Sequence, residues 1–293
     1  MSTVETTRVT GEQRPSIVFT NTNLPDILEL RHVRQTYANG KVCVLDDFNL
    51  LVENIPNRGQ FEVMLGPSGC GKSTVLRYLT GLQQPTSGEV LLYGRPITRD
   101  PGVTMVFQDY SSLPWLTVQE NVELPLELKG VPGKERRERA RALLAEVGLS
   151  GHEHKFAKYP NLSGGQLQRV AIARSLVANP KVIMMDEPFG ALDTITRLKM
   201  QLLLHQLWRK GGPEATIIFV THDLQEAIFL GTRIHIMSNP PGAHIVDSLE
   251  VDLPVDRTKE TKRTPEFIAL LARVDDLMEG VGYTHGSAYP STV

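Results

Sequence analysis

The most specific segment of this sequence is Gly66-Pro67-Ser68-Gly69-Cys70-Gly71-Lys72-Ser73-Thr74. It follows a short apolar run, Phe61–Leu65, and precedes a helical pattern over Val75–Thr80. A glycine, four residues, and then glycine, lysine and serine between a strand and a helix form the pattern of a phosphate-binding P-loop. A Gly-rich turn that merely starts a helix is the alternative, but both flanks that a P-loop requires are present. We therefore predict that this loop binds a nucleoside triphosphate.

The residues of this loop suit a phosphate for separate physical reasons. Glycines let the backbone curl so that successive N–H groups point toward one anion, and the helix that begins there adds its positive dipole end. We expect Lys72 to reach the β- and γ-phosphates and the Ser73 hydroxyl to ligate Mg²⁺. Cys70 lies at the start of the helix, where its thiolate could be favoured, although a small spacer is the interpretation we prefer.

Length and composition are those of an ordinary globular chain, since 293 residues can form one large domain or two small ones. A net charge of −2 gives no electrostatic argument for nucleic acid as a partner. Two cysteines, Cys43 and Cys70, are too few for a disulfide framework and favour a reducing compartment. No apolar run approaches the ~18 residues of a membrane span, and no signal peptide is visible. We expect a cytosolic chain.

Before the P-loop, the sequence predicts a leader and three short strands. Residues Met1–Pro25 are rich in Thr, Ser, Asn and Pro and are expected to form a mobile leader. Strands are predicted at Ile27–Val33, Val42–Leu45 and Phe48–Val52. Tyr37 stands in a loop between them, where it could stack on an adenine ring or simply anchor the loop.

After the P-loop, apolar runs predict strands at Glu89–Tyr93, Val103–Phe107 and Thr216–Val220. Gln108 ends the second of these runs and could ligate Mg²⁺ or orient an attacking water, although a single Gln at a strand end is usually only solvated. Lys134–Val147 is predicted to be a helix, and its basic first half is expected to be a solvated face rather than a nucleic-acid patch.

A second glycine-rich motif lies far from the P-loop in the sequence. It is Leu162-Ser163-Gly164-Gly165-Gln166, and it opens a predicted helix that runs to Ala178. Ser163 is a good N-cap, and the paired glycines leave bare N–H groups at a positive helix end. Such turns are common, so the prediction of a second anion site depends on the surrounding motifs.

Two acids, Asp186 and Glu187, end a run of four apolar residues that is typical of a strand buried on both faces. Ligands of open α/β sheets bind at the carboxyl ends of the strands. We therefore assign Asp186 to the Mg²⁺ shell and Glu187 to accept a proton from the attacking water. Asp193 follows in the next turn. His222 lies just past Thr216–Val220, at a similar strand end, which favours a catalytic role over a structural one.

The order and spacing of these motifs resemble the ATPase subunits of ABC transporters, over roughly Ile27–Ser248. The Leu-Ser-Gly-Gly-Gln signature at Leu162–Gln166 is the specific part, because other P-loop proteins lack it. The resemblance implies an α/β fold: a P-loop NTPase core with a mainly parallel sheet, an antiparallel β subdomain and an inserted α-helical subdomain. The implied ATPase domain spans residues 26–250, with the helical subdomain at about 108–179.

The resemblance also implies a role for each motif residue. The implied catalytic residues are Glu187 as general base, His222 as a contact to the γ-phosphate, Gln108 and Lys72. The implied Mg²⁺ ligands are Ser73, Gln108 and Asp186. The implied ATP-binding residues are Tyr37, Gly66, Pro67, Ser68, Gly69, Cys70, Gly71, Lys72, Ser73, Thr74, Ser163, Gly164, Gly165, Gln166 and Asp193.

Partners follow from the same resemblance. In this family two ATPase subunits pair head to tail, so that Ser163–Gln166 of one subunit caps the ATP on the P-loop of the other. The loop around Trp115 would contact an integral membrane permease, which places the chain at the cytoplasmic face of the membrane. A substrate-binding protein would be an indirect partner, and no nucleic acid is expected.

Two stretches narrow the subclass. Ser112–Val118 and Glu187–Asp193 are similar to those of the nitrate, sulfonate, taurine and bicarbonate import group. Residues 251–293 are expected to form an extension with one amphipathic helix, at Thr264–Met278, and leave no room for the extra β-domain of sugar-type importers. Two departures from the family pattern are a long turn at Asn54–Gln60 and Gly231-Thr232 where an acid is common.

Three rival functions fit the sequence less well. Soluble ABC-type ATPases that act on nucleic acid or ribosomes usually carry two ATPase units or a long coiled coil, and here there is one motif set without sustained heptads. Exporter halves often include membrane helices in the same chain. A nucleotide-sensing subunit without turnover is disfavoured by the intact Glu187 and His222. We therefore predict an ATP-hydrolysing importer subunit for a small solute.

Overall fold

A six-stranded sheet forms the centre of the computed structural model, which describes residues 24–56, 58–97, 102–108, 111–210 and 215–282. Its order is β10-β9-β3-β8-β7-β6; β9 to β6 are parallel, and β10 is antiparallel to β9. Layers cover both of its faces, and its three central strands are therefore almost fully buried. The strands are β3 (Phe61–Leu65), β6 (Thr104–Val106), β7 (Val182–Asp186), β8 (Thr216–Thr221), β9 (Arg233–Met237) and β10 (Ile245–Glu250).

A second sheet is antiparallel, in the order β2-β1-β4-β5. Its strands are β1 (Leu28–Tyr37), β2 (Val42–Val52), β4 (Ser87–Leu92) and β5 (Arg95–Pro96). The prediction of two strands, Val42–Leu45 and Phe48–Val52, was wrong, because β2 is one continuous strand. A bulge accommodates the polar residues Asp46 and Asp47 in its middle. Pairing slips by one residue between Val33↔Phe48 and Gln35↔Leu45, and Asp47 has φ 51°.

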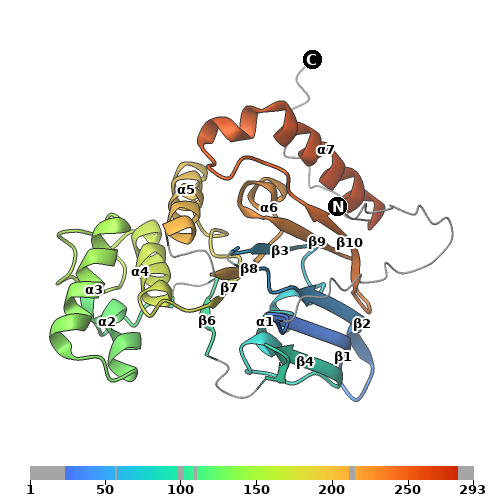
Figure 1. Cartoon of the computed structure of the whole chain (residues 1–293), viewed down its shortest axis with the longest axis horizontal. Helices are drawn as coiled ribbons and strands as arrows, with labels where there is room; N and C mark the ends of the chain where they lie inside the picture. Colours follow the sequence, from blue (N-terminus) through green and yellow to red (C-terminus); the bar gives the residue numbers. More distant parts are fainter. Residues whose placement is uncertain (1–23, 57, 98–101, 109–110, 211–214, 283–293) are drawn as a thin grey trace.

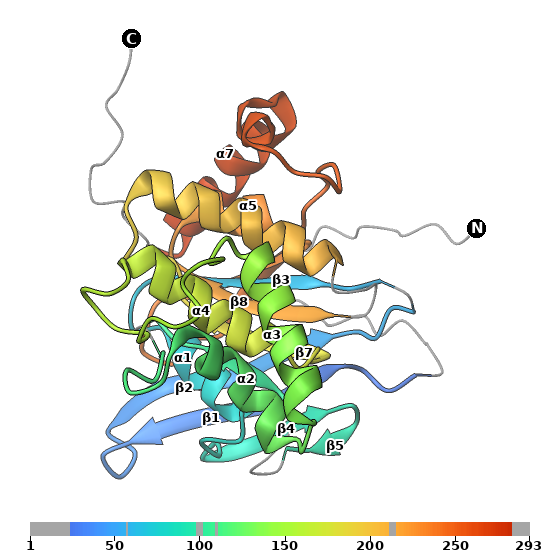
Figure 2. The ribbon, with the colours of Figure 1, turned by 90° about the vertical axis from the view of Figure 1, so that its left-hand side faces the viewer.

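Helix α1 (Lys72–Leu79) lies between the two sheets (Figures 1 and 2). Val75, Leu76 and Leu79 of α1 are fully buried and share one core cluster with residues of β2 and β8. On the opposite face, α5 (Thr194–Lys210) and α6 (Leu224–Leu230) pack onto the sheet. The P-loop therefore joins the central strand β3 to a helix held between two apolar layers.

Three helices form a group to one side of the sheets (Figure 1): α2 (Val118–Leu128), α3 (Gly133–Glu146) and α4 (Gly164–Leu176). Helices α3 and α4 follow the predicted positions, although α4 ends two residues earlier than predicted. The sequence patterns do not predict α2, because Pro125 interrupts its helical pattern near the end. The signal that could have revealed it is the capping box of Thr117 and Glu120 at its start.

The segment after β10 returns to the core. It contains a 3₁₀ helix, η1 (Lys259–Arg263), and α7 (Pro265–Gly280), which lies over α6. Phe267 and Val274, on the predicted apolar side of α7, are buried in the same core cluster as α6. Within the described parts of the chain, no helix combines the length and hydropathy needed to cross a membrane. The predicted leader, residues 1–25, lies almost wholly outside the described residues.

The departure at Gly231-Thr232 has a structural explanation. The Thr232 hydroxyl accepts from the Phe61 N–H at 2.9 Å and donates to the Phe61 carbonyl at 3.1 Å, so it closes the start of β3. A Cβ at Gly231 would lie 2.7 Å from the Ala227 carbonyl oxygen. These residues fix the passage from α6 to β9 and lie away from the P-loop end of β3.

Candidate functional site

The P-loop connects the end of β3 to the start of α1 through two glycines with left-handed backbone. Gly69 has φ 81° and Gly71 has φ 96°, which a side chain rarely adopts. A Cβ at Gly71 would also lie 2.8 Å from Leu45 Cδ2. Lys72 Nζ donates to the carbonyls of Gly66 and Pro67 at 2.8 and 2.9 Å, and its side chain is 5% exposed. The ammonium group therefore lies across the loop, where a bound phosphate would meet it.

Cys70 is fully buried, and its Sγ lies 4.0 Å from Met237 Sδ. Burial raises the pKa of the Cys70 thiol, against a smaller opposite effect of Lys72. The hypothesis that its thiolate is favoured at the helix start is therefore wrong, because desolvation outweighs the helix dipole and the nearby lysine. Cys70 acts as a small buried spacer.

Oxygen donors for a divalent cation meet at the end of β7. The Ser73 hydroxyl donates to Asp186 Oδ1 at 3.0 Å. Burial raises the pKa of Asp186, and the hydrogen bond from Ser73 opposes that rise. Gln108 Nε2 and the Glu187 carboxylate both lie close to Gly190, at 3.6 and 3.9 Å from where its Cβ would be. The Ser73 hydroxyl and the Asp186 carboxylate are hard oxygen donors that fit Mg²⁺. The role of Gln108 as a third ligand stays a prediction.

Glu187 and His222 form a pair at the ends of the neighbouring strands β7 and β8. His222 Nδ1 lies 2.9 Å from Glu187 Oε2, and Lys72 Nζ lies 4.0 Å from Glu187 Oε1. The hydrogen bond from His222 lowers the pKa of Glu187, and the same contact raises the pKa of His222. Glu187 has φ 41°, and its N–H donates to the Val220 carbonyl at 3.0 Å. The backbone thus aims an ionised carboxylate at the space beside the P-loop.

The signature motif lies at the start of α4, in the helical group and away from α1 (Figure 1). Ser163 and Gln166 form a capping box: the Ser163 N–H donates to Gln166 Oε1 at 2.9 Å, and the Gln166 N–H donates to Ser163 Oγ at 3.4 Å. Gln166 Nε2 also contacts His152 Nε2 at 2.9 Å. A Cβ at Gly165 would lie 2.6 Å from Thr196 Cγ2, so a glycine is needed where α4 approaches α5. One chain does not bring this motif to its own P-loop.

Asp193 and Tyr37 lie outside the group formed by the P-loop and the β7 and β8 ends. Asp193 Oδ1 accepts from the N–H groups of Ile195 and Thr196, each at 3.1 Å, and so caps α5. Hydrogen bonds from Thr196 lower its pKa. Tyr37, at the end of β1, is 41% exposed, and its hydroxyl accepts from Gln83 Nε2 at 2.9 Å. An ATP-binding role for either residue stays a prediction.

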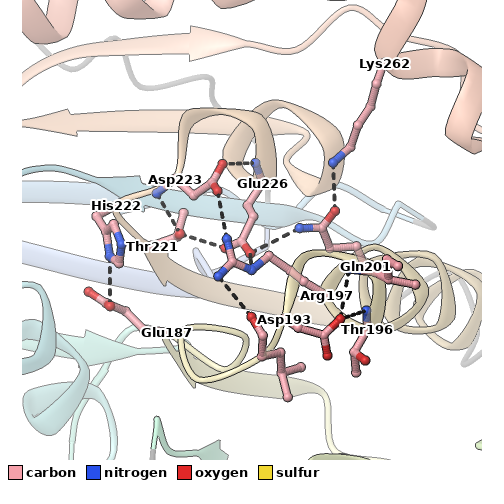
Figure 3. A network of polar contacts seen from close by, with 12 residues as sticks. Glu187, Asp193, Thr196, Arg197, Gln201, Thr221, His222, Asp223, Glu226 and Lys262 are labelled. Carbon is pink, nitrogen blue, oxygen red and sulfur yellow. Dashed lines mark hydrogen bonds and ion pairs between the residues drawn. The ribbon is translucent and has the colours of Figure 1, made fainter. Parts of the chain in front are cut away.

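A buried polar network, which sequence reasoning missed, lies next to the glutamate–histidine pair (Figure 3). Thr221, which precedes His222, donates its hydroxyl hydrogen to Glu226 Oε2 at 2.8 Å. Arg197 Nη2 donates to the Leu192 carbonyl at 3.2 Å, and Arg197 Nε lies 3.7 Å from Glu226 Oε1. The signal that could have found it is an acid, Glu226, within the otherwise apolar helix α6.

Comparisons with known proteins identify the family of this chain. A model of the ABC transporter family matches residues 52–190. The chain is 41% identical over 263 residues to the nitrate import ATP-binding protein NrtD of Synechocystis sp., covering 86% of this chain and 95% of NrtD. It is 39% identical over 251 residues to the taurine import ATP-binding protein TauB of Escherichia coli, covering 83% of this chain and 94% of TauB.

Solved structures give the same fold. One is cbiO1 from Clostridium perfringens, described as part of the ABC transporter complex cbiONQ, with a TM-score of 0.68, 27% identity, and coverage of 87% of this chain and 99% of cbiO1. Another is the dimeric ATP-binding cassette MJ0796 bound to ADP and Pi, with a TM-score of 0.64, 35% identity, and coverage of 78% of this chain and 100% of MJ0796. The predicted fold class, with its mainly parallel core sheet, antiparallel sheet and helical group, is confirmed.

Proposed function

Because this chain belongs to the ABC transporter family, we propose that it is the ATP-hydrolysing subunit of an importer for a small anion or sulfonate. The observation that carries this proposal is the pair Glu187–His222 held 2.9 Å apart beside the P-loop lysine. The support for import comes from the relatives. NrtD and TauB are named for nitrate and taurine import, and the match covers nearly their whole length. Nitrate, taurine, other sulfonates and bicarbonate are the solutes to test.

Each site residue would have its own role in the hydrolysis of ATP. Lys72 would stabilise negative charge on the transferred phosphoryl group, as a fixed donor within a partly closed site. Glu187 would orient the attacking water and accept its proton. His222 keeps that carboxylate in place through Nδ1 and would turn its other nitrogen toward the γ-phosphate. Ser73, Asp186 and Gln108 would hold Mg²⁺, which neutralises phosphate charge when bound.

A second ATPase subunit is part of the proposal. The signature loop presents the backbone N–H groups of a helix start, yet it lies away from the P-loop of the same chain (Figure 1). A head-to-tail pair would place Ser163–Gln166 of one chain against the ATP bound to the other. The dimeric state described for MJ0796 supports this arrangement. Either a second copy of this chain or a related subunit would complete the pair.

Three exposed aromatic side chains in and around the helical group support a membrane permease as the other partner. Trp115 is 67% exposed, Phe156 47% and Tyr159 80%. The segments of Trp115 and Phe156 run side by side, because the Ala157 N–H donates to the Leu116 carbonyl at 3.0 Å. Exposed aromatic side chains are enriched at protein interfaces. The chain would thus reach the membrane through the permease, and a substrate-binding protein would act only indirectly.

Uptake by cells tests this function directly. In a strain that lacks the gene, uptake of labelled nitrate, taurine or bicarbonate should fall and should return with the unmodified chain but not with Glu187→Gln. A strain that takes up all of these solutes at the normal rate would contradict the proposed substrate class. Restoration of uptake by Glu187→Gln would instead contradict the coupling of import to ATP hydrolysis by this chain.

A further inference from the structure

Lys262, in the 3₁₀ turn η1 after the ATPase core, reaches back into the network beside His222 (Figure 3). Its Nζ donates to Gln201 Oε1 at 2.9 Å and lies 5.0 Å from the centre of the Phe229 ring. Burial lowers the pKa of Lys262, so its position in this apolar surrounding has an energetic cost. Lysine side chains usually keep their ammonium group in water, so the inward course of Lys262 needs a reason.

The ammonium group fixes the orientation of the Gln201 amide. An ammonium ion donates hydrogen bonds and accepts none, so Gln201 must turn its oxygen toward Lys262 and its NH₂ group toward Glu226. Gln201 Nε2 accordingly donates to Glu226 Oε1 at 3.1 Å, with both side chains buried. The remaining carboxylate oxygen of Glu226 accepts from Thr221 Oγ1 at 2.8 Å. Donors thus meet both oxygens of Glu226, and these hydrogen bonds oppose the rise in its pKa that burial causes.

The orientation of the Thr221 hydroxyl then fixes the backbone around His222. Because its hydrogen points to Glu226, its oxygen is free to accept from the Asp223 N–H, at 3.0 Å. Thr221 and Asp223, the residues on either side of His222, are therefore joined by this hydrogen bond. On the other side of Glu226, Arg197 connects the same carboxylate to the Leu192 carbonyl, one residue before Asp193. One buried carboxylate thus holds two loops of the site.

We infer that Lys262 is a positioning residue for ATP hydrolysis, which acts through Gln201 and Glu226 to hold His222 and the Asp193 turn in place. The C-terminal segment is then part of the machinery rather than a cover for α6. The inference rests on the proposed ATPase function.

The pH dependence of activity distinguishes this role from simple packing. Burial raises the pKa of Glu226, and Asp223 raises it further, whereas the hydrogen bond from Thr221 and the charge of Arg197 lower it. The charged or titratable groups that face Glu226 are Arg197 of α5, Lys262 of η1, and His222 and Asp223 in the turn before α6. Loss of Lys262 removes a positive charge and frees Gln201 to turn its oxygen toward Glu226. Protonation of Glu226 would then begin at higher pH and release the Thr221 hydroxyl.

The test compares three variants of the full chain: Lys262→Met, Lys262→Arg and Lys259→Met. Lys259 belongs to the same turn, but its side chain is 73% exposed, so it is the matched control. For Lys262→Met we expect kcat to fall about fivefold with little change in KM for ATP, because Lys262 acts through Gln201 and Glu226 and not on the nucleotide itself. We also expect the acid limb of the pH profile to move to higher pH. Lys262→Arg should keep kcat and the acid limb of the pH profile close to those of the unmodified chain. Lys259→Met should change neither kcat nor the pH profile.

Glu226→Gln supplies a second arm that keeps the shape of the side chain. It should lower kcat. Adding Lys262→Met to it should cause no further loss of kcat, because Lys262 acts only through Gln201 and Glu226. Additive losses, or a pH profile of Lys262→Met that coincides with that of Lys259→Met, would overturn the inference. If the unmodified chain hydrolyses no ATP, the proposed function fails instead, so the two failures are distinguishable.

Discussion

The P-loop and the signature loop are both glycine-rich turns at the start of a helix, but their surroundings differ. Across the P-loop lies Lys72, which donates to two of its carbonyls at 2.8 and 2.9 Å. In the signature loop, Ser163 and Gln166 satisfy each other in a capping box. The first loop thus carries a cation for a phosphate, and the second offers mainly the N–H groups and dipole of α4.

The difference indicates that one chain holds a catalytic half-site and a separate capping half-site. Asp186, Glu187 and His222 come together at the ends of β7 and β8, beside the P-loop. The signature loop lies in the helical group, away from α1 (Figure 1). Substitutions in the first loop should therefore damage nucleotide binding in a single chain, whereas substitutions in the second should act only when two chains meet.

The largest effect is expected from Lys72→Ala in the catalytic half. Loss of the buried ammonium should weaken ATP binding and lower hydrolysis by about 10³-fold, because a fixed cation at the phosphates is removed. Titration with a fluorescent ATP analogue and a phosphate-release assay measure both. Lys41→Ala, at an exposed lysine in the turn before β2, is the control. Unchanged ATP affinity in Lys72→Ala would contradict the assignment of the P-loop.

Glu187→Gln should retain ATP binding and lose about 10²-fold in turnover, as expected for removal of a general base. NMR titration of His222 provides an independent check. The Glu187 contact raises the pKa of His222, so the titration midpoint of His222 should move to lower pH in the variant. A midpoint that stays in place, or near-normal hydrolysis, would remove Glu187 from its assigned role.

Ser163→Ala tests the capping half and should have an intermediate effect. Loss of the N-cap should cost about 1 kcal/mol of stability, and ATP-dependent pairing of chains should weaken about tenfold while single-chain ATP binding is retained. Thr117→Ala removes the same kind of capping box from α2 and is the matched control. If both variants pair equally well with ATP, the signature loop does not contribute to the interface.

The smallest effect concerns Cys70. Because it is fully buried and burial raises the pKa of its thiol, a thiol reagent should modify it more slowly than the half-buried Cys43. Peptide mass spectrometry after timed labelling gives both rates. Faster labelling of Cys70 in the folded chain would show that the loop opens far more than this packing suggests.

The same comparison shows what could be predicted from the sequence. The P-loop, the acids at the end of β7 and the histidine after β8 follow local rules, because a motif and its flanking strand or helix lie within a few residues of each other. The carboxyl ends of adjacent parallel strands then bring Asp186, Glu187 and His222 together. These parts of the fold and site are determined by short-range patterns.

Other features depend on contacts that no short pattern contains. Lys262 and Gln201 lie far apart in the chain, so nothing local indicates that they meet. The bulge at Asp47 makes one strand resemble two, and Pro125 hides helix α2. The thiol of Cys70 illustrates the same limit: its pKa depends on burial by the whole core, which a helix position alone does not reveal.

The most direct test of the two half-sites is sedimentation of purified Glu187→Gln with and without Mg-ATP. The account predicts a monomer without nucleotide and a dimer with Mg-ATP, and it predicts that adding Ser163→Ala shifts the mixture back toward monomer. ATP binding should be followed in the same samples. Chains that bind Mg-ATP but remain monomeric at every concentration would contradict the head-to-tail pairing of this chain with itself.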